Sequence, residues 1–109
     1  MDFKEYQKLA HRTAQTVQIG TEYIYPVLGL AGEAGELTNK IKKIFRDDKG
    51  VVTDLRKAEI INELGDILWY VAEISTRLDL SIDEIAQANI QKLASRLYRN
   101  TINGDGDIR

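Results

Sequence analysis

The sequence has no cysteine and only one histidine, His11. These absences exclude a disulfide framework, a thiolate metal site, a cysteine nucleophile and a metal centre built from several histidines. No apolar stretch approaches the ~18 residues that a membrane-spanning helix needs. Residues 1–5 also lack the basic and apolar regions that begin a signal peptide. We therefore expect a cytoplasmic protein with no membrane partner.

The sequence also lacks a strong excess of either charge. Its 15 basic and 17 acidic residues give a net charge of -2, so no nucleic-acid partner is expected. With 109 residues, of which 43% are hydrophobic, the chain can build one modest core. Residues 51–53 could extend, but no other segment supplies a partner strand. We expect a single all-α domain over residues 1–109, with its core at about 2–99 and a mobile tail at 100–109.

Hydrophobic periodicity predicts four helices, which together would form a four-helix bundle-like protomer. They are expected at residues 2–18, about 27–45, 54–78 and 82–97. Gly20 is a plausible end for the first helix. Thr53 or Asp54 is expected to cap the third, and Ser81 with Glu84 forms a capping box at the start of the fourth.

Two helical segments each carry a pair of acids at positions i and i+3, which places both acids of a pair on one side of a helix. The pairs are Glu33 with Glu36 and Glu63 with Asp66. One reading is structural, with the acids paired to nearby cations: Lys40, Lys43, Arg56 or Lys57. The other is a metal site. Carboxylates without histidine or cysteine favour Mg²⁺ or Mn²⁺ over zinc, and Mg²⁺ often completes its shell with substrate phosphates.

Glycine and aromatic residues accompany these pairs. The second helix contains three glycines within seven residues: Gly29, Gly32 and Gly35. Glycine is a poor helix former, so their presence indicates either close helix packing or backbone kept clear for a ligand. Trp69 falls opposite the apolar stripe of its helix, so we expect a partner or second subunit to cover it. Candidates to stack on a ligand are Tyr6, Tyr23, Tyr25, Trp69 and Tyr70.

The fourth predicted helix places Asn89, Lys92 and Arg96 along one side at spacings of three and four. One hydrogen-bonding amide and two cations suit phosphate oxygens. The same pattern also fits an ordinary solvated helix face.

The acid pairs and their flanks resemble the MazG-type all-α nucleoside triphosphate pyrophosphohydrolases, whose mark is E-x-x-E followed after a linker by E-x-x-D. The matching segments are Gly29-Leu30-Ala31-Gly32-Glu33-Ala34-Gly35-Glu36-Leu37 and Asn62-Glu63-Leu64-Gly65-Asp66-Ile67-Leu68-Trp69-Tyr70. The segment from Asn89 to Arg96 resembles the family's downstream region, and the likeness spans residues 26–99. Many members carry two adjacent glutamates at the start of the first motif, whereas this chain has Gly32 at the earlier position.

This resemblance implies an enzyme that cleaves a ribo- or deoxynucleoside triphosphate between its α- and β-phosphates, releasing a monophosphate and pyrophosphate. Glu33, Glu36, Glu63 and Asp66 would hold Mg²⁺, or Mn²⁺ in its place. Glu33 or Glu36 would polarise the attacking water. The amide and cations of the fourth helix, Asn89, Lys92 and Arg96, would bind the substrate. The resemblance also implies a homodimer or homotetramer that assembles through its helices.

Other phosphohydrolase classes fit the sequence less well. A Nudix hydrolase needs a fixed Arg-Glu run and strands, an HD phosphohydrolase needs several histidines, and a Walker loop needs a glycine-rich run ending in Lys-Ser or Lys-Thr. None of these patterns occurs in the chain. The alternative outside enzymes is a non-catalytic helical interaction module whose acid pairs are structural.

Overall fold

The computed structural model describes residues 1–15, 22–100 and 102–107, and this part of the chain is all-helical. It contains four helices and no strand, which confirms the predicted all-α class. None of the described helices is long and apolar enough to cross a membrane. The helices are α1 (Phe3–Arg12), α2 (Ile24–Asp47), α3 (Asp54–Arg77) and α4 (Ile82–Tyr98).

Side chains cap three of the four helix starts. Asp2 accepts a hydrogen bond from the Glu5 amide at 2.8 Å, which begins α1. Thr53 accepts from the amide three residues later at 3.2 Å, and Ser81 accepts from the Glu84 amide at 3.4 Å. Since first-turn amides have no acceptor within their own helix, each of these contacts stabilises a helix start. The predicted caps of α3 and α4 are confirmed.

The boundaries of the first two helices differ from the prediction. α1 ends at Arg12, before the predicted end at residue 18, and the hydroxyl of the next residue, Thr13, donates to the Ala10 carbonyl at 2.7 Å. Residues 16–18 and Gly20 lie outside the described residues. α2 begins three residues early, so Pro26 lies inside its first turn. Proline is accepted there because a first-turn amide has no helical acceptor to lose.

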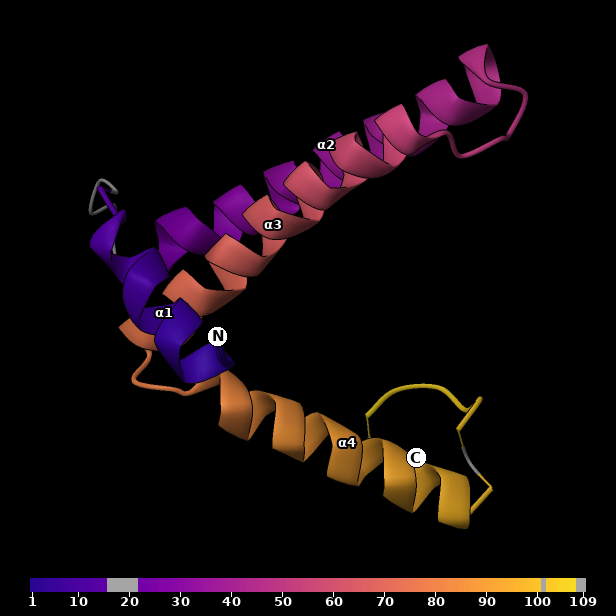
Figure 1. Cartoon of the computed structure of the whole chain (residues 1–109). Coiled ribbons are helices and arrows are strands. Elements are labelled where there is room, and N and C mark those ends of the chain that lie inside the picture. Colours follow the sequence, from indigo (N-terminus) through magenta and orange to yellow (C-terminus); the bar gives the residue numbers. More distant parts are fainter. Residues whose placement is uncertain (16–21, 101, 108–109) are drawn as a thin grey trace.

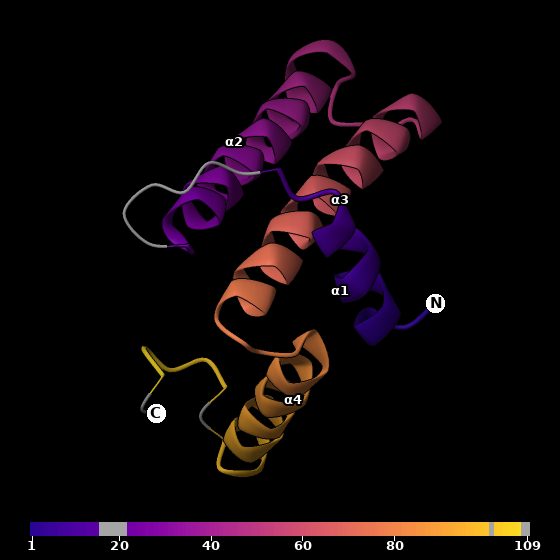
Figure 2. The same cartoon turned by 90° about the vertical axis from the view of Figure 1, so that its left-hand side faces the viewer.

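α2 and α3 form a long antiparallel hairpin, and the other helices gather at one end of it (Figure 1). α1 packs on α3, while α4 contacts α1 and α3 only and runs away from the hairpin (Figure 2). No described residues of α2 and α4 come into contact. The bundle-like packing that we expected is therefore only partly formed, since one chain leaves α4 without a neighbouring helix along most of its length.

The core lies where α1, α3 and α4 meet. Ala10, Ala72 and Ile82 are buried together, with Tyr6 and Trp69 packed against them. α1 covers part of Trp69, so part of the cover that we expected from a partner or second subunit comes from within the chain. The indole Nε1 also donates to Thr13 Oγ1 at 2.8 Å. The apolar periodicity of α3 predicted that Trp69 lies opposite the apolar stripe. It could not predict that α1 packs on that face of α3.

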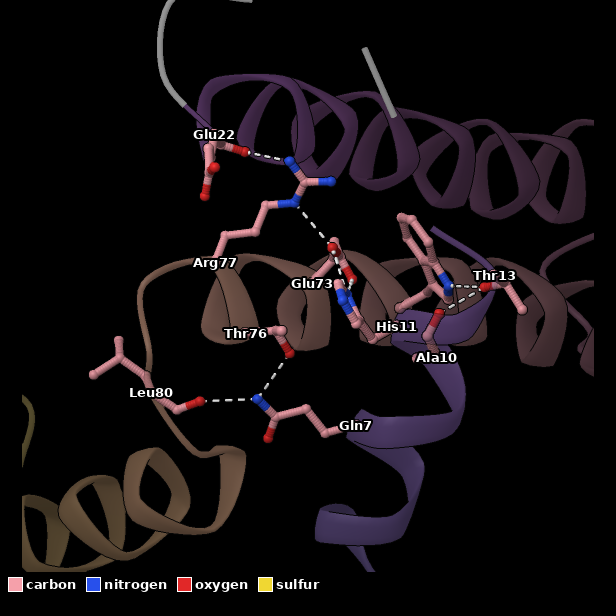
Figure 3. Close-up of polar contacts among 10 residues, drawn as sticks. Gln7, Ala10, His11, Thr13, Glu22, Glu73, Thr76, Arg77 and Leu80 are labelled. Carbon is pink, nitrogen blue, oxygen red and sulfur yellow. Dashed lines mark hydrogen bonds and ion pairs between the residues drawn. The ribbon is translucent and has the colours of Figure 1, made fainter. Parts of the chain in front are cut away.

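A polar network, shown in Figure 3, fixes α1 on α3. Glu73 is fully buried and accepts from Arg77 Nε at 2.9 Å. His11 Nδ1 of α1 lies 3.1 Å from the same carboxylate. The Gln7 amide donates to Thr76 Oγ1 at 3.0 Å and to the Leu80 carbonyl at 2.8 Å. Buried polar groups are costly unless hydrogen-bonded, so this network specifies one docking position for α1.

Candidate active site

Three carboxylates meet where α2 passes α3. Glu33 comes from α2, and Glu63 and Asp66 come from successive turns of α3. Each offers one oxygen, and these oxygens all lie within 4.8 Å of one another. Glu33 and Glu63 are partly buried, while Asp66 is exposed to solvent. A set made only of carboxylate oxygens fits a hard divalent cation such as Mg²⁺.

Glu36, the fourth predicted acid, is exposed and lies outside this three-carboxylate group. It occupies the next turn of α2, one turn along from Glu33. Its charge nonetheless reaches the group, since it contributes to raising the pKa of Glu33. The structure therefore brings three of the four predicted acids together and leaves Glu36 at their margin.

The negative charges of the acids at this site are not neutralised by nearby basic side chains of the described residues. Burial raises the pKa of Glu33 above its usual range, and the charges of Asp66, Glu63 and Glu36 raise it further. Within the described part of the chain, none of these four acids forms an ion pair with a lysine or arginine. Arg56, one of the expected partners, instead binds acids elsewhere, at 2.7 and 3.0 Å. The structural pairing that we considered from the sequence is thus not formed.

A cavity of about 320 Å³ opens beside the acids. Its lining consists of Thr13, Glu33, Asp66, Trp69 and Tyr70. The two aromatic rings meet edge to face, with centroids 5.0 Å apart and planes at 88°. Burial raises the pKa of the Tyr70 hydroxyl, and neighbouring Tyr25, Glu33 and Asp66 add to the rise. A larger cavity of about 490 Å³ lies between α1 and the α3–α4 turn. It does not contain the grouped acids.

The four glycines near the acids differ in their surroundings. A Cβ on Gly29 would overlap the ring of Tyr70, so this glycine allows the ring to lie against the α2 backbone. A Cβ on Gly32, Gly35 or Gly65 would meet nothing within 4 Å. Close packing therefore explains Gly29, whereas the glycines between and before the acids face open space.

The predicted substrate-binding residues lie on α4, apart from the acids. Asn89 and Lys92 line another cavity of about 320 Å³. Arg96 is buried, and its Nη2 donates to the Asp107 carboxylate at 3.1 Å. Since α2 and α4 do not touch in the described residues, one chain does not join this ridge to Glu33.

Sequence reasoning missed one residue of the cavity beside the acids. Trp69 and Tyr70 were among five aromatic candidates, but Thr13 was not considered. Thr13 lies in the turn after α1, far from the acid motifs along the chain. No sequence pattern therefore links it to the cavity beside the acids. Only the docking of α1 on α3 shows it, through the hydrogen bond from the indole of Trp69.

Comparison with known proteins identifies the family of the chain. The sequence model of the MazG nucleotide pyrophosphohydrolase domain matches residues 25–99, which include all seven predicted site residues. The chain is also similar to the Gene 37 protein of Mycobacterium phage L5. The two are 47% identical over 85 residues, which cover 78% of this chain and 75% of the phage protein. No solved structure gives a significant match. The resemblance drawn from the acid motifs is confirmed, and the chain belongs to the MazG nucleotide pyrophosphohydrolase family.

Proposed function

We propose that this chain is an Mg²⁺-dependent pyrophosphohydrolase that cleaves a ribo- or deoxynucleoside triphosphate between its α- and β-phosphates. The products would be a nucleoside monophosphate and pyrophosphate. The observation that carries this proposal is the group of Glu33, Glu63 and Asp66, which has no basic partner among the described residues of a MazG-family chain. Three grouped carboxylates repel one another, and a divalent cation relieves that repulsion.

In this proposal Glu33, Glu63 and Asp66 hold the cation, and Glu36 completes the set from the next turn of α2. Mn²⁺ would suit the same oxygen ligands. When bound, the cation supplies positive charge that neutralises the phosphate oxygens as the bond breaks. The chain itself supplies the base. Glu33 or Glu36 accepts the proton of the attacking water, because Glu33 lines the cavity and Glu36 lies one turn further along α2.

The substrate phosphates would also contact Asn89, Lys92 and Arg96. Because α4 runs away from the acids, we propose that a neighbouring chain supplies this ridge in a homodimer or homotetramer. Exposed apolar side chains support such an assembly, since large unpartnered apolar surface is typical of interfaces. On the α2–α3 hairpin and α4 these include Leu28, Phe45, Leu55, Ile61, Ile90 and Leu97.

The test is product identification with a panel of ribo- and deoxynucleoside triphosphates and Mg²⁺. Wild type would be compared with Glu36→Gln and Asp66→Asn. Glu59→Gln serves as the matched control, because it removes one negative charge from α3 outside the carboxylate group. We expect pyrophosphate and monophosphate from wild type and from the control. Loss of a metal ligand or base should lower kcat by about 10²–10⁴-fold in the other two variants.

Three results would contradict the proposal. Release of orthophosphate in place of pyrophosphate would mean cleavage at another bond. Full activity in Asp66→Asn, with the protein folded, would remove the acids from the mechanism. No turnover of any triphosphate, together with no thermal stabilisation by Mg²⁺ and nucleotide, would favour the interaction module.

A further inference from the structure

The C-terminal segment 102–107 lies against the ridge of α4 that we propose to bind phosphate. The chain reverses after α4 at Asn100, whose φ of 57° is in the left-handed region. The segment, drawn in yellow in Figures 1 and 2, then returns beside the helix, with residues 103–107 exposed to solvent. Its Asp107 carboxylate reaches both cations of the ridge, Lys92 and Arg96.

A single carboxylate oxygen joins the two cations. Asp107 Oδ1 accepts from Lys92 Nζ and from Arg96 Nη2, each at 3.1 Å. The Gly106 carbonyl accepts from the same Nη2 at 3.3 Å. The Arg96 side chain is only 5% exposed, whereas Asp107 is 83% exposed. The Arg96 guanidinium thus lies beneath the segment, whereas the Lys92 side chain, 42% exposed, and the Asp107 carboxylate face solvent.

These contacts keep Asp107 charged. The hydrogen bond from Lys92, and then that from Arg96, lowers the pKa of Asp107 below its ordinary value of 3.8. The group is therefore an anion at neutral pH. An anionic oxygen shared by an ammonium and a guanidinium is also how the same cations would hold a phosphate oxygen.

We propose that segment 102–107 is an intramolecular competitor of the substrate, with Asp107 occupying the position on Lys92 and Arg96 that a phosphate oxygen takes. The two anions cannot share this position, so the segment must leave before phosphate binds. This inference rests on the proposed function in one respect, the assignment of the two cations to phosphate.

Competition of this kind is reversible. Because Asp107 is mostly exposed, solvent and salt screen its ion pairs, and substrate can displace it. Because the segment is tethered, its local concentration stays constant while that of substrate varies. The apparent affinity for phosphate equals the intrinsic affinity multiplied by the fraction of chains in which the ridge is open. We expect the segment to lower the apparent affinity roughly threefold.

The decisive comparison is Asp107→Asn against Asp105→Asn in the full chain. Both changes remove one negative charge from the same segment. Asp105 forms no ion pair with a lysine or arginine in the described residues, so it controls for net charge. The probes are the dissociation constant of inorganic tripolyphosphate by calorimetry, and KM and kcat for a nucleoside triphosphate.

We expect Asp107→Asn to bind tripolyphosphate about threefold more tightly than Asp105→Asn does, with KM lower by the same factor and kcat unchanged. Equal or weaker binding of tripolyphosphate by Asp107→Asn would overturn the inference. A failure of tripolyphosphate to bind any of the proteins would also overturn it. Tighter tripolyphosphate binding without any nucleotide turnover would instead support the competition while refuting the proposed function. Turnover with equal constants in both variants would refute only the competition.

Discussion

Replacing Glu33 by glutamine should change the sign of a stability effect according to whether Mg²⁺ is present. Glu33 lies within 4.8 Å of carboxylate oxygens of both Glu63 and Asp66. Without metal, the substitution removes two repulsive pairs and should stabilise the protein. With metal, it removes one of the four proposed ligands and should reduce stabilisation by the ion.

The magnitude follows from the separation and the exposure of the acids. Two unit charges 4.8 Å apart repel by ~0.9 kcal/mol in water, and physiological salt roughly halves this energy. The dielectric constant of water is appropriate because Asp66 is exposed and the two glutamates are only partly buried. Two pairs therefore give ~1 kcal/mol, which corresponds to a rise of about 4 °C in Tm for a domain of this size.

Mg²⁺ should stabilise wild type much more than it stabilises Glu33→Gln. At ten times its dissociation constant, the ion would stabilise wild type by ~1.4 kcal/mol, or about 6 °C in Tm. Glu33→Gln should show little of this gain. Thermal unfolding with EDTA and with Mg²⁺ measures both effects, and Glu36→Gln should show the smaller change without metal, because Glu36 lies outside the group. A lower Tm for Glu33→Gln in EDTA would refute the argument.

The pH dependence gives a second check on the cost of charging Glu33, which arises from burial first and then from repulsion by Asp66, Glu63 and Glu36. The folded-state pKa of Glu33 is raised above 4.5, so the folded protein binds this proton more tightly than the unfolded chain does. The cost of the Glu33 charge is therefore absent below the unfolded value and complete above the raised pKa. In EDTA, the Tm difference between Glu33→Gln and wild type should be largest at neutral pH. It should close as the pH falls through the raised pKa, and a difference that grew instead would contradict the assignment.

Three further substitutions test packing and buried contacts outside the carboxylate group, all by urea denaturation. Gly29→Ala should destabilise the protein by ~1–3 kcal/mol, because the new methyl group would displace the Tyr70 ring. Gly35→Ala should stabilise it by ~0.5–1 kcal/mol, because a Cβ there meets open space. Equal effects of the two substitutions would show that the Tyr70 ring moves aside without cost. Glu73→Gln should destabilise by ~3 kcal/mol, because it leaves a buried guanidinium without its carboxylate partner, and a loss below ~1 kcal/mol would mean that the network is not needed to hold α1.

The features that the sequence predicted correctly depend on residues close together in the chain. Periodic apolar residues defined all four helices, and Thr53 and Ser81 marked two of their starts correctly. The spacing of Glu63 and Asp66 placed both on one side of α3 before any fold was known. These predictions succeeded because they depend on contacts within a few residues, which the sequence orders directly.

Tertiary packing decided the rest. The sequence could not show that Glu33 would join the α3 acids while Glu36 stayed outside, because that depends on how α2 is rotated against α3. Nor could periodicity show that α1 covers Trp69, since the contact with Thr13 links residues far apart in the chain. The sequence by itself determined which residues share a helix face. Only the packing of one helix on another, set by buried side chains from distant segments, determined which of those faces meet.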